Sequence, residues 1–186
     1  MLYSELQCSE AIHKAVERMG FAEMTEIQEK TIPVMLAGHD VIAKAPTGTG
    51  KTCAFGIPVA EHIQPENKYP QAVIMAPTRE LAQQIAEELS NLTYFMPEVQ
   101  VACVYGGANM EKQAKRLAEG CQIVVATPGR LMDHYKHHSI DISHVTQIVL
   151  DEADEMLNMG FYKDVRHIIE MMKARKALSM FSATIS

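Results

Sequence analysis

Residues 41–52 read Val41-Ile42-Ala43-Lys44-Ala45-Pro46-Thr47-Gly48-Thr49-Gly50-Lys51-Thr52, a short apolar run that passes directly into a glycine-rich turn. A buried strand, a glycine-rich turn and a helix that opens on Lys-Thr are the context of a phosphate-binding P-loop. Gly48 and Gly50 allow successive backbone N–H groups to point at one phosphate. The helix that follows would add the positive end of its dipole. We therefore expect this turn to bind phosphate.

Within the turn, Lys51 is expected to reach the β- and γ-phosphates, and Thr52 to be a ligand of Mg²⁺. Ala45 stands where the generic pattern has its first glycine, so the pattern is met imperfectly. The alternative is a glycine-rich strand–helix turn with a surface lysine. The residues expected to contact the nucleotide here are Ala45, Pro46, Thr47, Gly48, Thr49, Gly50, Lys51 and Thr52.

On both sides of this turn, short apolar runs alternate with longer amphipathic stretches. Runs of three to six mostly apolar residues are typical of strands that are buried on both faces of a parallel sheet. They are Val41–Ala45, Ala72–Ala76, Val99–Val104, Gln122–Ala126, Ile148–Leu150 and Ala177–Phe181. Between them, residues 79–92 carry Leu81, Ile85, Leu89 and Leu92 at helical spacing. This alternation predicts an α/β fold with a mostly parallel sheet and helices on both faces, preceded by a helical extension.

Length and composition are those of one globular domain. The chain has 186 residues, of which 47% are hydrophobic and 22% are charged. No apolar run approaches the roughly 20 residues that a membrane span requires, and no basic-then-apolar leader opens the chain. The four cysteines form no Cys-x-x-Cys pair, so they are interpreted as small buried side chains in a reducing compartment. We expect a cytoplasmic location and no membrane partner.

An acidic cluster, Asp151-Glu152-Ala153-Asp154, follows the apolar run Ile148–Leu150. A carboxylate at the end of a buried strand beside a P-loop is the expected partner of the Mg²⁺ that Thr52 would hold, and Asp151 takes that role. Glu152 is placed to orient and deprotonate the attacking water, as a general base. The alternative is a set of acidic residues that a helix N-terminus attracts through its dipole.

Threonine and proline mark two further places where a strand gives way to a helix, Pro77-Thr78-Arg79 and Thr127-Pro128-Gly129-Arg130. Capping of the helix N-terminus explains these residue types, and we expect it at both places. A capped N-terminus with an arginine in its first turn also suits a phosphate, so the two could follow a nucleic-acid backbone without reading bases. Gly106-Gly107 would allow a sugar-phosphate chain to approach, although such a pair is usually a turn.

Two observations leave alternatives open. Thr25 and Gln28 have the spacing of a capping box, yet the Gln28 amide could also recognise the N6 and N7 edge of adenine, with Phe21 against the ring. The net charge of −6 counts against an extended nucleic-acid surface, so any basic surface must be a narrow strip.

The motifs together, and their order, resemble the DEAD-box RNA helicase family. Gly20-Phe21 through Gln28 resembles the Q motif, residues 45–52 motif I, and residues 77–82 motif Ia. Gly106-Gly107 resembles the GG element, residues 127–130 motif Ib, residues 151–154 the Asp-Glu-Ala-Asp box, and Ser182-Ala183-Thr184 motif III. The resemblance implies a RecA-like P-loop domain that binds ATP, Mg²⁺ and RNA. It divides the chain into an N-terminal extension with the Q motif, residues 1–29, and a RecA-like core, residues 30–186.

The resemblance also implies roles by position. Phe21 and Gln28 would recognise adenine, and Asp154, Ser182 and Thr184 would link the nucleotide site to RNA. The residues expected to contact RNA are Pro77, Thr78, Arg79, Gly107, Thr127 and Arg130. Tyr3 stands where the family usually has an isolated phenylalanine, and Met24 where proline is common.

The family's second domain is not expected within these 186 residues, so the chain is interpreted as a first domain that is nearly inactive alone. Two other classes remain open. A different P-loop NTPase is disfavoured because a guanine-reading Asn-Lys-x-Asp is absent from the sequence. A non-catalytic, ATP-responsive binding module is disfavoured because Lys51, Asp151 and Glu152 are all present.

Overall fold

Six parallel strands form the centre of the molecule, in the order β1-β6-β5-β2-β4-β3. The computed structural model describes residues 1–46 and 50–183. The strands are β1 (Ile42–Lys44), β2 (Ala72–Met75), β3 (Val101–Val104), β4 (Ile123–Ala126), β5 (Gln147–Asp151) and β6 (Ala177–Ser182). The predicted parallel sheet is therefore confirmed.

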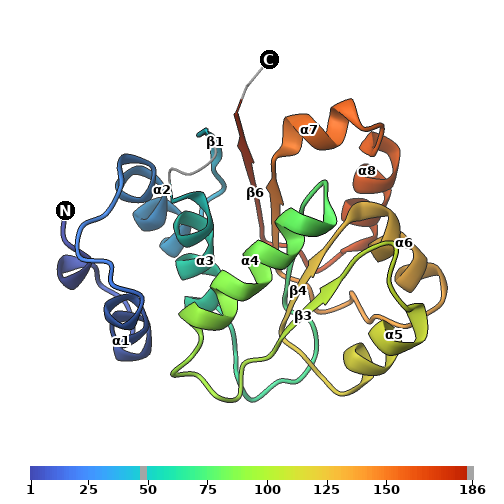
Figure 1. Ribbon diagram of the computed structural model, residues 1–186, viewed down its shortest axis with the longest axis horizontal. Coiled ribbons are helices and arrows are strands. Elements are labelled where there is room, and N and C mark those ends of the chain that lie inside the picture. Colours follow the sequence, from blue (N-terminus) through green and yellow to red (C-terminus); the bar gives the residue numbers. More distant parts are fainter. Residues whose placement is uncertain (47–49, 184–186) are drawn as a thin grey trace.

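Helices cover both faces of this sheet (Figure 1). A short 3₁₀ helix, η1 (Tyr3–Glu5), opens the chain. The helices on one face are α1 (Glu10–Arg18), α2 (Glu26–Leu36), α3 (Lys51–Glu61) and α4 (Arg79–Leu92). Those on the other are α5 (Met110–Ala118), α6 (Pro128–Lys136), α7 (Ala153–Asn158) and α8 (Tyr162–Met171). None of the helices in the described part of the chain is long and apolar enough to cross a membrane.

Alternate residues of the strands divide the core in two. Ile74 on β2 packs with the α1–α4 layer, whereas its neighbours Val73 and Met75 pack with the α5–α8 layer. This division follows from the pleat of a strand, in which successive side chains point to opposite faces. Because both faces are covered, the strands are apolar at nearly every position, which explains why they are recognisable in the sequence.

The strand bounds differ from the sequence prediction by one or two residues, and the differences at β3 and β5 have clear causes. β3 begins at Val101 rather than Val99, because the Val99 N–H closes a turn by donating to the Met96 carbonyl. β5 is longer than predicted, because its pairing with β6 continues through Asp151 opposite Phe181. Asp151 is therefore the last residue of a strand and is held by the sheet.

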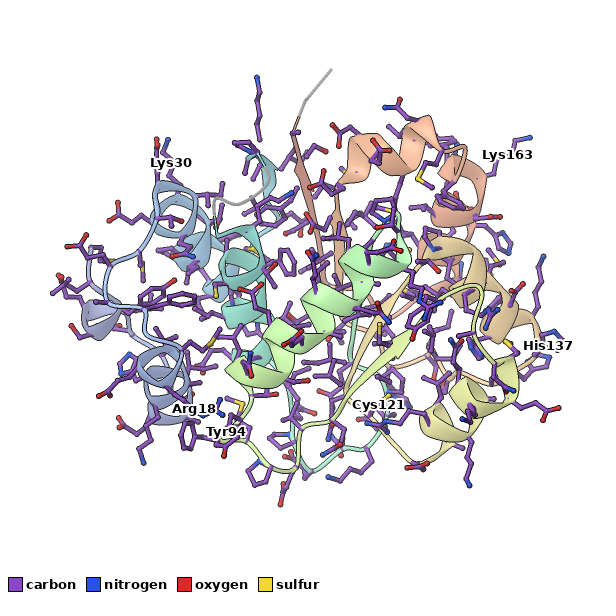
Figure 2. The ribbon with its side chains drawn as sticks, viewed as in Figure 1. Arg18, Lys30, Tyr94, Cys121, His137 and Lys163 are labelled. Carbon is purple, nitrogen blue, oxygen red and sulfur yellow. The ribbon has the colours of Figure 1, made fainter. Side chains whose placement is uncertain are left out.

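The N-terminal extension is helical, as expected, and packs against the α3–α4 side of the molecule. The Arg18 guanidinium at the end of α1 lies 3.7 Å from the ring centroid of Tyr94, which follows α4 (Figure 2). Helix α2 crosses the division expected after residue 29 and packs along α3. The extension thus joins the helix layer that carries the P-loop helix.

Candidate functional site

Except for the stretch from Gly20 to Gln28, the sequence motifs lie at the carboxyl ends of strands, where open parallel sheets bind ligands. Across the edge, the P-loop follows β1, Ser182 ends β6, and the acidic cluster follows β5. Thr78 then follows β2, Thr127 follows β4 and Gly107 follows β3. The strand order therefore places the expected nucleotide residues at one end of the edge and the expected RNA residues at the other.

Lys51 joins the P-loop helix to the acidic cluster. Its ammonium group lies 3.3 Å from a carboxylate oxygen of Asp151 and donates a hydrogen bond to Glu152. Lys51 and Asp151 are buried, with 6% and 1% of their surfaces exposed. Burial alone would lower the pKa of Lys51, but the bond to Glu152 and the charge of Asp151 outweigh it and raise that pKa. Lys51 is thus a cation held by two carboxylates.

Glu152 occupies a strained backbone conformation. It is the N-cap residue of α7 and has φ 53° and ψ 48°, in the left-handed region that residues other than glycine rarely adopt. Its N–H donates to Oδ1 of Asp151 at 3.0 Å. Strain of this kind costs on the order of 1 kcal/mol and clusters at functional sites. Here it turns the Glu152 carboxylate back toward Lys51.

The residues around Lys51 fit a magnesium ion. Thr52 is the second residue of α3 and carries a hydroxyl, and Asp151 carries a carboxylate that pairs with the adjacent residue Lys51. Hard oxygen donors of these two kinds are what Mg²⁺ prefers, and it usually needs few protein ligands when phosphates complete the set. The chemistry of the donors therefore matches the ion expected from the sequence.

Gln28 forms the capping box, one of the two alternatives that the sequence left open, and it also contacts Gly50. Its side chain and that of Thr25 form the predicted capping box, with Thr25 N–H donating to Oε1 at 3.0 Å. Its Nε2 also donates to the carbonyl of Gly50, the N-cap residue of α3, at 3.1 Å. Gly50 has φ 81°, and a Cβ there would lie 2.4 Å from Nε2. The glycine therefore permits both the turn and the approach of Gln28.

Phe21 and Gln28 are brought together through Tyr3. The Tyr3 hydroxyl donates to Oε1 of Gln28, and its ring stacks on Phe21 with centroids 6.3 Å apart. Phe21 and Tyr3 line one hollow of about 410 Å³, and Thr25 lines another of about 340 Å³ with Ala45 and Pro46. Sequence reasoning did not assign this hydroxyl a role, because the contact spans 25 positions and leaves no local pattern.

Thr78, Arg79 and Gly107 come together at the opposite end of the edge. Thr78 caps α4 as predicted, accepting a hydrogen bond from Leu81 N–H at 3.2 Å. The exposed Arg79 places its guanidinium 4.7 Å from the ring centroid of Tyr105, and a Cβ on Gly107 would lie 3.9 Å from its Nη1. Pro77 is buried, so we expect it to shape the turn rather than to touch a ligand.

The structure of Thr127 and Arg130 differs from the sequence prediction. The prediction is that Thr127 caps the helix and that Arg130 is available to bind phosphate. The side chain of Thr127 makes no capping bond, so that prediction is wrong; Pro128 takes the first helical position instead. Arg130 is only 13% exposed and its Nη1 donates to Ala108 O and to Oε1 of Gln113, both at 3.0 Å. Arg130 therefore anchors the segment after Gly107, and Gln113 is a partner that the sequence did not reveal.

Ser182 contacts the acidic cluster as expected. Its Oγ accepts a hydrogen bond from the Asp154 backbone N–H at 3.3 Å, which joins the end of β6 to the first turn of α7. The expected hydrogen bond between Ser182 and Asp154 is thus made by the backbone N–H of Asp154. Thr47, Gly48, Thr49 and Thr184, which were also expected to take part in the site, lie outside the described residues.

The comparisons with known proteins agree with this arrangement. A family model described as DEAD/DEAH box helicase matches residues 25–186. The chain belongs to the DEAD/DEAH box helicase family. It is 50% identical over 185 residues to the ATP-dependent RNA helicase CshA of Limosilactobacillus reuteri, and 50% identical over 183 residues to that of Listeria monocytogenes. These alignments cover 100% and 98% of this chain, but 37% and 35% of the relatives.

A solved structure confirms the RecA-like fold. The crystal structure of a DEAD box protein from the hyperthermophile Methanococcus jannaschii superimposes with a TM-score of 0.91 at 41% sequence identity. It covers 100% of this chain, and this chain covers 51% of it. The chain therefore spans about a third of the curated relatives and half of this solved relative.

Proposed function

We propose that this chain is the first domain of an ATP-dependent RNA helicase, which binds Mg-ATP and the RNA backbone. The observation that carries the proposal is the position of Lys51 between Asp151 and Glu152, at the start of a helix that follows a glycine-rich turn. A cation and two carboxylates at the carboxyl edge of a parallel sheet supply the groups that phosphoryl transfer from ATP to water requires. The relatives named ATP-dependent RNA helicases support it.

In this proposal, ATP displaces carboxylates from Lys51. The γ-phosphate offers the ammonium group a doubly charged partner, so Lys51 moves its hydrogen bonds from Glu152 to phosphate oxygens. Glu152 is then released to accept a proton from the attacking water. Bound Mg²⁺, held by Thr52 and Asp151, would supply charge neutralisation of the phosphates. The pair of Lys51 and Glu152 is thus the arrangement of the site before ATP binds.

RNA would lie at the other end of the edge. Arg79 is exposed beside Gly107, at the start of the capped helix α4, and the positive end of that helix favours phosphate. Arg130 holds the backbone of Ala108 in place, so it would act by shaping this surface as well as by its charge. Contacts of this kind address the sugar-phosphate backbone, so little sequence preference is expected.

We also propose that hydrolysis requires a second RecA-like domain. Among the described residues, Lys51 and the two acids form one cluster, which would face the γ-phosphate of ATP from one side. As negative charge develops in the transition state, an arginine from a second domain would stabilise it from the opposite side. The span of the curated relatives, nearly three times that of this chain, leaves room for such a domain. The cytoplasm is the compartment that we propose.

The roles of the charged residues can be separated by substitution in a protein that joins this chain to a second helicase domain. Glu152→Gln keeps the shape of the side chain but removes its basic oxygen, so ATP should still bind while turnover falls by roughly 10²-fold or more. Lys51→Ala should weaken ATP binding itself. Glu155→Gln, on the exposed face of α7, is the matched control and should leave both unchanged.

Calorimetric titration with ATP and a phosphate-release assay measure the two quantities. Turnover that survives Glu152→Gln largely intact would remove Glu152 as the base. Binding of ADP and GDP with equal affinity by the unmodified chain would argue against the selective recognition of adenine.

A further inference from the structure

The hydrogen-bonding capacity of Gln28 is nearly exhausted inside the protein. A glutamine amide has one oxygen with two lone pairs and one nitrogen with two N–H groups. In this structure Oε1 accepts from Thr25 N–H and from the Tyr3 hydroxyl, and Nε2 donates to the Gly50 carbonyl. The Gln28 residue is only 3% exposed. Both acceptor positions are therefore occupied, and one N–H has no partner among residues 1–46 and 50–183.

An adenine ring needs the position that Tyr3 occupies. The edge of adenine that an amide recognises presents one donor, the N6 amino group, and one acceptor, N7. The remaining N–H of Gln28 suits N7 of any purine, but the N6 amino group requires a lone pair on Oε1. The Thr25 N–H belongs to the capping box at the start of α2 and is fixed by the backbone. The Tyr3 hydroxyl is therefore the partner that adenine must replace.

We propose that Tyr3 holds Gln28 in a docked position against Gly50 and that adenine binds by displacing the Tyr3 hydroxyl from Gln28. Tyr3 is thus a positioning residue for nucleotide recognition, a role that rests on the ATP site proposed above. The segment that carries it is well held: the ring is 5% exposed and stacks on Phe21, and the Tyr3 N–H donates to Ala22 O at 3.0 Å.

The docked position also connects the base to the phosphate loop. Gly50 directly precedes Lys51, and its carbonyl accepts the Nε2 bond of Gln28 at 3.1 Å. The amide that would bind adenine is therefore the same amide that holds the start of α3. Breaking the hydrogen bond between Tyr3 and Gln28 therefore costs free energy, and this cost lowers the affinity for a nucleotide that binds both Gln28 and the P-loop.

Tyr3→Phe tests this, because it removes the hydroxyl and keeps the ring. Oε1 retains Thr25, so the fold should be preserved. The dissociation constant for ADP should decrease about three- to tenfold, which is the range of one net hydrogen bond. Binding of inorganic tripolyphosphate, which has no base, should be unchanged. Tyr94→Phe, which removes a hydroxyl from an exposed side chain far from Gln28, is the matched control and should change neither.

A double-mutant cycle assigns the effect to the proposed contact. In a Gln28→Ala background, Tyr3→Phe should no longer change ADP binding. An unchanged or weaker ADP affinity in Tyr3→Phe, or an effect of the same size without Gln28, would overturn the proposal. Equal affinity for ADP and GDP before any substitution would overturn the recognition of adenine by Gln28, and no binding of either nucleotide would overturn the proposed ATP site.

Discussion

At the scale of single residues, Lys51 shows how a carboxylate in the resting site could be exchanged for a phosphate. Its ammonium group lies among buried carboxylates, where an isolated charge would be costly and a paired one is tolerated. A phosphate can replace Glu152 without leaving the cation unpaired, because one anion is exchanged for another. The strained backbone of Glu152 belongs to the same arrangement, since it turns that carboxylate toward Lys51. The resting contacts thus hold together the groups that we propose for hydrolysis.

His134 makes a prediction about pH at the same scale. It is fully buried on α6, its Nε2 bonds to Oε1 of Gln113 at 2.9 Å, and Nδ1 has no hydrogen-bond partner among the described residues. Burial, reinforced by the nearby Arg130 charge, lowers the pKa of His134. Above about pH 6.5 the folded and unfolded states both hold it neutral. As the pH falls below that value, His134 binds a proton more readily in the unfolded state than in the folded state. The free energy of unfolding therefore decreases.

We expect the free energy of unfolding to fall between pH 7 and pH 5.5 through this residue, because its pKa is lower in the folded state. His134→Gln keeps a donor toward Gln113 but does not titrate, so it should remove that part of the acid sensitivity. His39→Gln changes an exposed histidine and serves as the control. Urea unfolding at the two pH values measures the difference, and equal acid sensitivity in His134→Gln and the unmodified chain would refute the prediction.

At the scale of elements, strand β6 connects two parts of the site, and its two buried serines separate coupling from stability. Ser182 Oγ accepts from Asp154 N–H, whereas Ser179 Oγ accepts from Val41 N–H at 3.0 Å. Each substitution by alanine leaves one backbone N–H without its partner and should cost about 1 kcal/mol of stability. In a protein with a second domain, only Ser182→Ala should also reduce the stimulation of ATP hydrolysis by RNA.

The readout is the ratio of ATPase rates with and without RNA, beside the unfolding free energy of each variant. Ser179→Ala provides the matched loss of one hydrogen bond on the same strand. An equal fall in RNA stimulation for both serines would mean that β6 only supports the fold.

The elements themselves could be predicted well from the sequence, because each carries a local signal. The strands are apolar runs buried on both faces, and α4 begins at Arg79 and ends at Leu92 as its leucine and isoleucine spacing indicates. The contacts of Tyr3 with Gln28 and of Gln113 with Arg130 could not be predicted. They join residues 25 and 17 positions apart, and such pairs meet only after the helices pack. The predicted capping bond at Thr127 is wrong, because the Thr127 side chain makes no such bond and Pro128 follows it at the start of the helix.

At the scale of the whole molecule, the order of the strands explains how one edge can serve two ligands. β5 and β6 lie between the P-loop strand β1 and the strands that carry Thr78, Thr127 and Gly107. The acidic cluster and Ser182 lie at the ends of these two central strands, so the groups proposed for catalysis and coupling lie between the proposed ATP and RNA sites. The net charge of −6 agrees with a small RNA surface around Arg79 rather than an extended basic face.

The central claim is that the chain is one half of an ATP-driven motor, and RNA-stimulated ATP hydrolysis measures it most directly. The 186-residue chain alone should show almost none, because only one side of the phosphate is contacted. Joining a second RecA-like helicase domain should raise the rate by about 10³-fold or more, as an added arginine does in other NTPases. Substitution of that domain's arginines should abolish the gain. Robust RNA-stimulated hydrolysis or duplex unwinding by the 186-residue chain alone would contradict the account.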